Sequence, residues 1–140
     1  MKNFFAAAGL LVVLTFSSSV FAAGALVIGE PKDLADGFAS GWAINQSNED
    51  VAQARAFEQC RHKADATEAV RTLCKTFRTF ANQCVTIALD LEPGATGTGY
   101  AIAPTKVEAE RIALENCRAT AGSRGHACRV INGGCDGTAK

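Results

Sequence analysis

The sequence has no excess of charge of either sign, because 14 lysine and arginine residues balance 14 aspartate and glutamate residues among its 140 residues. Proteins that bind nucleic acid usually carry a basic excess or a basic stripe, and proteins that adsorb to anionic membranes need one as well. The composition therefore argues against nucleic acid and against a membrane surface as partners.

Several catalytic signatures are also missing. The chain has no G-x-S-x-G motif for a hydrolase nucleophile and no C-x-x-C motif for thiol–disulfide exchange. The glycine-rich segment 94–99 reads GATGTG, but a strand-like run follows it and no Lys-Ser/Thr pair closes it. A phosphate loop needs a helix start at that point, so a hairpin loop is the better interpretation and no cofactor is expected.

The N-terminal segment has the layout of a secretory signal peptide. Lys2 is the only charge before Glu30, an apolar run follows from Phe4 to Phe16, and small residues lead up to Ala22. That run is shorter than the ~20 residues that span a bilayer as a helix, which disfavours a retained anchor. We expect cleavage after Ala22, or two or three residues later, and a periplasmic or secreted protein.

Removal of residues 1–22 leaves one domain, 23–140, with 13 basic and 14 acidic residues because only Lys2 is lost. All six cysteines remain, and an even count in an exported chain predicts disulfide bonds. Six cysteines are too few for a scaffold held by bridges alone, so we expect a hydrophobic core as well. The cysteines are Cys60, Cys74, Cys84, Cys117, Cys128 and Cys135.

One pattern is written twice, from Gly41 to Arg61 and again from Gly99 to Arg118. Trp42 in the first copy aligns with Tyr100 in the second. The shared order and spacing indicate two related halves, about 23–84 and 85–140, closed into one pseudo-twofold domain. The other aligned positions are Gly41, Ala43, Ile44, Ala52, Ala56, Glu58, Cys60 and Arg61 with Gly99, Ala101, Ile102, Ala109, Ala113, Glu115, Cys117 and Arg118.

Each half is predicted to contain two strands, a helix and a third strand. Ser47 with Asp50, and Thr105 with Glu108, have capping-box spacing at the two helix starts. Alanines at steps of four residues then give each helix a face of small side chains. We predict an α+β fold of two β-β-α-β repeats, with one six-stranded, mainly antiparallel sheet and both helices on one of its faces. Segment 63–73 is an insertion in the first half and should lengthen the helix or add a turn.

The repeat also suggests a disulfide pairing among the 15 that six cysteines allow. If the halves are equivalent, Cys60–Cys74 and Cys117–Cys128 each join a helix end to the next strand. The remaining pair, Cys84–Cys135, would then join the halves near the symmetry axis. Each short loop contributes roughly 3 kcal/mol in the chain-entropy account of disulfides.

The tandem strand–helix pattern, with GYAIAPTKVEAERIALENC and CRVINGGC in the second half, resembles the bacterial exported family called domain of unknown function 4189. The resemblance covers most of the chain after residue 22, although the run from Cys60 to Cys74 is longer than the family pattern. It implies secretion and disulfide bonds, and it supplies no catalytic residue.

Two sets of side chains are candidates for a chemical site. Cys60, His62, His126 and Cys128 are the residue types of a tetrahedral zinc site, but the two histidines do not hold equivalent positions in the repeat, so disulfides are favoured and no metal is expected. Ser123, His126 and Asp136 are the residue types of a hydrolytic triad, but a polar loop is the simpler interpretation.

Trp42 and Tyr100 are the remaining candidates. Packing within the fold is the simpler role for both, and a shared aromatic binding surface is the functional one. Our hypothesis is a non-enzymatic, inhibitor- or immunity-like module of the cell envelope or the secreted fraction, whose partner is another protein. The alternatives are an envelope-directed hydrolase that uses His126 and a structural or stress-linked envelope protein.

Overall fold

The structure is a computed structural model that describes residues 22–32, 36–92, 94 and 97–140, apart from the side chains of residues 123, 124 and 126. Of the signal peptide expected at 1–22, only its last residue lies within the described part. The first repeat contains β1 (Ala23–Gly29), β2 (Ala39–Gln46), α1 (Glu49–Arg61), α2 (Glu68–Thr72) and β3 (Lys75–Phe80). The second contains β4 (Cys84–Asp90), β5 (Thr98–Ala103), α3 (Lys106–Ala121), the 3-10 helix η2 (Gly122–Ala127) and β6 (Cys128–Cys135).

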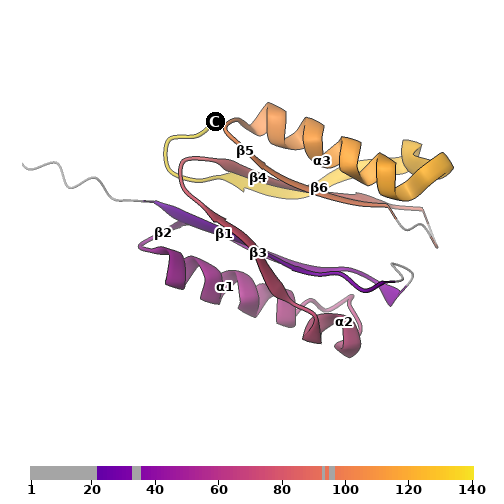
Figure 1. The fold of residues 1–140 in the computed structure, drawn as a ribbon, viewed down its shortest axis with the longest axis horizontal. Coiled ribbons are helices and arrows are strands. Elements are labelled where there is room, and N and C mark those ends of the chain that lie inside the picture. The colour runs from indigo at the N-terminus through magenta and orange to yellow at the C-terminus, as the bar shows by residue number, and fades with distance from the viewer. Residues whose placement is uncertain (1–21, 33–35, 93, 95–96) are drawn as a thin grey trace, which may run out of the picture.

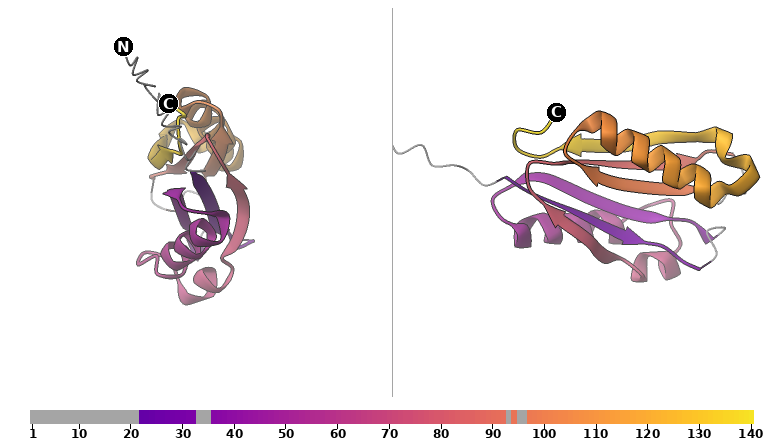
Figure 2. Two further views of the ribbon diagram at one scale, coloured as in Figure 1. Left: turned by 90° about the vertical axis from the view of Figure 1, so that its left-hand side faces the viewer. Right: turned by 45° about the horizontal axis from the view of Figure 1, so that its top comes forward.

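The strands form two antiparallel sheets, with strand orders β2-β1-β3 and β5-β4-β6. The α+β class and the two β-β-α-β repeats are confirmed, and the insertion adds the short helix α2. The single six-stranded sheet is corrected, because each repeat builds its own sheet. The placement of both helices on one face is corrected as well, because the sheets stack face to face and α1 and α3 cover the two opposite outer faces (Figures 1 and 2).

The outer face of each sheet is lined by small side chains that let a helix approach closely. Alternate residues of β2, namely Ala39, Gly41 and Ala43, face α1. A Cβ atom added at Gly41 would overlap the carbonyl oxygen of Ala56 in α1. Gly99 of β5 has the same relation to Ala113 of α3. Each copy of the repeated motif therefore forms the same close contact between a helix and a sheet.

The inner faces carry the large side chains, and they form the core between the sheets. The alternating pattern that places alanine and glycine outward in β2 and β5 places aromatic and branched residues inward. Such a face needs cover, and both helices already lie on the outer faces. The buried members of this core are Leu26, Ile28, Phe80, Val85 and Ile87, and the partly buried ones are Phe38, Trp42, Ile44, Tyr100 and Ile102.

Side chains at the predicted positions start the two long helices, with one shift. Thr105 caps α3 by accepting a hydrogen bond from the backbone amide of Glu108 at 3.3 Å. In α1 the cap is Asn48 and not Ser47, and its Oδ1 accepts from the amide of Val51 at 2.9 Å. The capping side chain lies three residues before the amide that donates to it. In α1 this residue comes one position later than the sequence pattern indicated.

The three disulfide bonds are Cys60–Cys74, Cys117–Cys128 and Cys84–Cys135, the pairing expected from the repeat. The first two join equivalent helix ends to equivalent strands. The role expected for Cys84–Cys135 is corrected: Cys84 begins β4 and lies opposite Cys135 of β6, so this bond closes the second sheet and does not join the halves.

The C-terminal tail joins the halves through Asp136, whose side chain is fully buried. Its carboxylate accepts hydrogen bonds from the backbone amide of Asn45 at the end of β2, at 2.6 Å, and of Asn82 before β4, at 3.0 Å. Both asparagines have positive φ, 55° and 52°, a conformation that asparagine tolerates better than most residues. The tail thus holds two turns of the first repeat against the second sheet.

We expect Gly41→Ala to destabilise the protein by about 1–3 kcal/mol, the usual cost of overpacking, because the new methyl group would force α1 away from β2. Ala54→Ser on the exposed face of α1 is the control and should cost about 0.5 kcal/mol. Urea unfolding followed by the fluorescence of Trp42 measures both. Equal midpoints for the two variants would mean that the close helix–sheet contact does not exist.

Candidate functional site

The two stacked sheets meet along two edges, and the predicted aromatic residues lie at different ones. At one edge Trp42 of β2 packs over β6, where a Cβ added at Gly134 would lie 2.9 Å from the Trp42 ring. At the other edge Tyr100 of β5 packs against Phe77 of β3, with ring centroids 4.9 Å apart in an edge-to-face arrangement. Trp42 and Tyr100 are therefore equivalent within the repeat but do not form one continuous surface.

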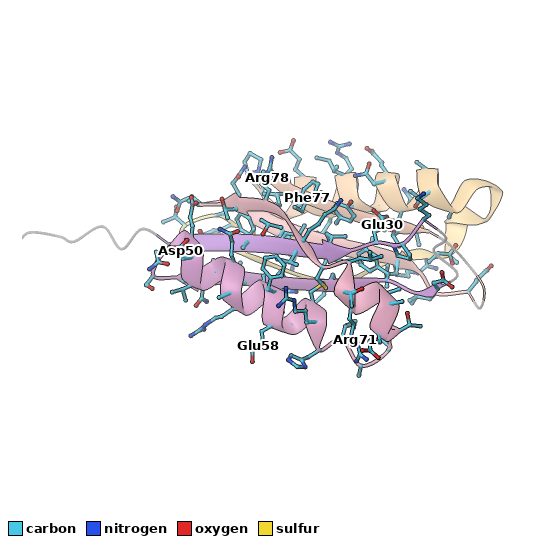
Figure 3. All side chains as sticks on the ribbon, turned by 60° about the horizontal axis from the view of Figure 1, so that its bottom comes forward. Glu30, Asp50, Glu58, Arg71, Phe77 and Arg78 are labelled. Carbon is cyan, nitrogen blue, oxygen red and sulfur yellow. A yellow bond between two sulfur atoms is a disulfide. The ribbon has the colours of Figure 1, made fainter. Side chains whose placement is uncertain are left out.

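The edge with Tyr100 is hollowed. Two adjoining clefts, of about 400 and 320 Å³, share Glu30, Phe77 and Tyr100 as walls, and we call them together the seam cleft. Asn116 and Thr120 of α3 complete one side, and Lys75 and Thr76 of β3 complete the other. Glu30 and Phe77 are labelled close to each other in Figure 3.

Phe77 reaches the cleft because β3 contains a bulge. Val27 of β1 pairs with Thr76 and Leu26 pairs with Arg78, so Phe77 is the extra residue between two successive pairs. A bulge redirects a side chain out of the regular alternation. Half of the Phe77 side chain (50 %) is exposed, although its ring also contacts Tyr100.

Glu30 follows the end of β1 and connects the two sheets at the cleft. Its carboxylate accepts hydrogen bonds from the hydroxyl groups of Thr98, at 3.1 Å, and Tyr100, at 3.3 Å. Burial raises the pKa of the Tyr100 phenol above its usual value, and the negative charge of Glu30 and its hydrogen bond raise it further. The phenol therefore stays protonated at neutral pH and keeps donating to Glu30.

Helix α3 fixes the second wall of the cleft. The side-chain amide of Asn116 donates to the carbonyl oxygen of Tyr100 at 3.2 Å. The hydroxyl of Thr120 donates to the carbonyl oxygen of Thr98 at 2.7 Å and accepts from the amide of Thr98 at 2.8 Å. These bonds hold β5 and α3 together on this side of the cleft in the absence of a ligand.

The seam cleft offers a carboxylate beside two aromatic rings and hydrogen-bonding groups from α3. Such a set complements a cation or a basic side chain that also carries apolar surface, because aromatic faces attract cations. The lining can therefore offer a ligand a negative charge, hydrogen bonds and apolar surface.

The other sequence-based candidates do not join this cleft. Asp136 is fully buried and each of its carboxylate oxygens accepts a backbone amide, so this acid holds the tail. Ser123 and His126 lie in η2, and their side chains lie outside the described part. Cys60 and Cys128 are bonded to other cysteines and offer no thiolate to the zinc site that was considered.

Of the cleft residues, Tyr100 is predicted from the sequence, whereas Phe77 and Glu30 are not. The segment KTFRTF gave one signal, because it places a large aromatic residue among polar neighbours on a strand at the edge of its sheet. The sequence contains no comparable signal for Glu30. Its role depends on the stacking of two sheets, whereas the sequence pattern predicts a single sheet.

The titration of Tyr100 tests the geometry of the cleft, and this residue is the single tyrosine of the chain. The negative charge of Glu30 disfavours the tyrosinate, so Glu30→Gln should lower the pKa of Tyr100 while burial keeps it above the usual value of about 10. Because the pKa is raised by folding, the free energy of unfolding should fall as pH rises above about 10. Ultraviolet absorbance of the tyrosinate measures the titration, and an unchanged midpoint in Glu30→Gln would show that the two side chains are not in contact.

Three disulfide bonds point to an oxidising, non-cytoplasmic environment. Among the residues that the structure describes, no helix combines the length and the hydropathy required to cross a membrane.

Comparison with known proteins adds the family. Residues 24–135 match the family described as a domain of unknown function, DUF4189. No curated protein and no solved structure matches the chain. The match runs from β1 to the last residue of β6 and so takes in both repeats. The chain therefore belongs to the DUF4189 family.

Proposed function

We propose that the protein is an exported, non-enzymatic binding module that holds a basic side chain of another protein in the seam cleft. The observation that carries this proposal is Phe77, a half-exposed aromatic ring at a bulge, beside Tyr100 and the carboxylate of Glu30. Among the exposed large hydrophobic residues of the described part, Phe77 is the aromatic one, and it lines a cleft. A partner that covers the ring would remove that apolar surface from water.

The cleft is built in advance, which lowers the cost of binding. The edge-to-face contact with Tyr100 already restricts the Phe77 ring, and Asn116 and Thr120 restrict the strand below it. Side chains that are ordered before association lose little conformational entropy when they bind. Aromatic residues held in this way are the usual energetic centres of protein interfaces.

Charge selects the occupant. Among the described residues, the carboxylate of Glu30 accepts two hydroxyl donors, and a carboxylate has room for further donors. Lys75 lines the cleft but forms no ion pair with Glu30 among the described residues. An arginine or lysine of the partner can therefore place its charge at Glu30 and its stem along Phe77.

The export step fits the start of the fold. Cleavage after Ala22 leaves β1 whole, whereas cleavage two residues later would remove Ala23 and Gly24, which pair with Gln46 and Phe80. We therefore expect the periplasmic or secreted protein to begin at Ala23. Intact mass of the exported chain tests this, and a chain that keeps residues 1–22 would contradict it.

The oxidised protein, residues 23–140, serves as bait for cross-linked capture from the envelope and the medium of the bacterium that produces it. A true partner should be lost with Phe77→Ala, at a cost of about 2 kcal/mol or more, because that variant removes the anchor. The partner should also bind the Glu30→Gln variant more weakly than the wild type. Its binding to the wild type should weaken at high salt, because salt screens the charge of Glu30.

The repeat supplies the matched control for this experiment. Ile131 of β6 is also the extra residue at a bulge, between the pairs Ile87–Asn132 and Ala88–Val130, and 40 % of its side chain is exposed. Ile131→Ala removes a comparable apolar side chain from the equivalent place in the other sheet. Partners that are lost equally with Ile131→Ala and Phe77→Ala, or with neither, would refute the seam cleft as the binding site.

A further inference from the structure

We propose that the first repeat carries a second, independent site, which binds a phosphate monoester group between α1 and α2. A cleft of about 540 Å³ lies there, lined by Arg61, His62, Glu68, Arg71 and Thr72. It lies on a different part of the fold from the seam cleft, and none of its lining residues is shared with that cleft. Figure 3 labels Arg71 on α2.

Within the described part of the chain, neither guanidinium group of this cleft forms an ion pair with a carboxylate. The ion pairs among the described residues are Lys63–Asp65, Lys106–Glu110 and Arg111–Glu115, and none of them uses Arg61 or Arg71. Arg61 instead lies over the ring of Phe57, with its guanidinium carbon 5.2 Å from the ring centroid. Stacking on a ring leaves the N–H edges of a guanidinium free to donate to an oxyanion.

The Cys60–Cys74 disulfide fixes the two walls of the cleft relative to each other. Arg61 and His62 directly follow Cys60, and Arg71 and Thr72 come just before Cys74. Both cysteines are buried, and Val70 anchors α2 in the core with 1 % of its side chain exposed. The arginines therefore extend from a cross-linked frame, which reduces the entropy lost when they converge on a ligand.

The site lies in the stretch where the two repeats differ in length. Cys60 and Cys74 are 14 residues apart, whereas Cys117 and Cys128 are 11 apart. Arg118 follows Cys117 as Arg61 follows Cys60, but Gly125 stands three residues before Cys128, where Arg71 stands before Cys74. Gly125 also lies so close to Arg118 that a Cβ there would be 2.7 Å from the Arg118 Cα atom. The first repeat thus carries an arginine at the position where the second repeat has a glycine packed against its helix.

The lining defines the ligand more closely than its charge alone. Two guanidinium groups and an imidazole favour an oxyanion, and a tetrahedral phosphate can accept from both guanidiniums. Glu68 disfavours a bare anion but can accept a hydrogen bond from a hydroxyl group next to the phosphate. A phosphate ester with a neighbouring hydroxyl satisfies both, and it can come from a free polyol phosphate or from a lipid headgroup.

Titration of the oxidised protein with glycerol 3-phosphate, followed by amide chemical shifts, tests the site. The largest shifts should fall on Arg61, His62 and Arg71, and inorganic phosphate should bind more weakly. Arg71→Ala and Arg61→Ala should each weaken binding by about tenfold or more, as expected when a charged hydrogen bond is lost. Arg71→Lys keeps the positive charge but loses the planar guanidinium group with its paired N–H donors. This variant should bind glycerol 3-phosphate less tightly than the wild type.

Arg118→Ala is the matched control, because it removes the equivalent arginine from the repeat without the insertion. Its affinity for glycerol 3-phosphate should equal that of the wild type. Equal losses in Arg118→Ala and Arg71→Ala, or no saturable shifts in the wild type, would overturn the proposal. Phe77→Ala should leave the binding of glycerol 3-phosphate unchanged. The phosphate site and the seam cleft are therefore tested independently of each other.

Vesicles that contain lysophosphatidic acid, whose free hydroxyl lies next to its phosphate monoester, separate the two sources of the ligand. If the site serves a free polyol phosphate, glycerol 3-phosphate binds and the vesicles do not sediment the protein in an Arg71-dependent way. If it serves a lipid headgroup, the vesicles sediment the wild type and Arg118→Ala but not Arg71→Ala. Sedimentation that is equal for all three proteins, without binding of glycerol 3-phosphate, would reject a phosphate site at Arg61 and Arg71.

Discussion

The close approach of a helix to a strand of small residues determines the rest of this structure. Gly41 and Gly99 admit the backbone of a helix to a distance that no side chain would permit. The alternation of a strand then turns every large neighbour, including Trp42 and Tyr100, to the opposite face. Two such faces cannot both remain in water, and the stable arrangement is to pack them against each other.

The binding surfaces follow from this stacking. Where the two sheets meet along β3 and β5, the bulge at Phe77 and the end of β1 at Glu30 leave the seam cleft. Asp136 ties the C-terminal tail to turns that flank the first sheet, so the two sheets are held in fixed relation. The second cleft arises differently, from a segment added to one repeat and closed by that repeat's own disulfide bond.

Features set by local sequence could be predicted, and features set by the packing of the halves could not. The capped helix starts, the alanine faces of α1 and α3 and the cysteine pairs near Cys60 and Cys117 depend on spacings within one repeat. The number of sheets depends on what covers the large faces, which the periodicity of a single strand does not show. That error also hid the seam cleft and assigned Cys84 to the wrong half, although the small–large alternation of GWAI and GYAI contained the necessary signal.

The stacking of the two sheets is the central claim, and nuclear Overhauser contacts of two residues test it most directly. The chain contains a single tryptophan and a single tyrosine, so their ring protons can be assigned without ambiguity. Stacked sheets predict contacts from Tyr100 to the ring of Phe77 and from Trp42 to Gly134, one at each edge of the core. Contacts from Trp42 to side chains of α1, with none to β6, would instead place the helix on the large face and contradict the account.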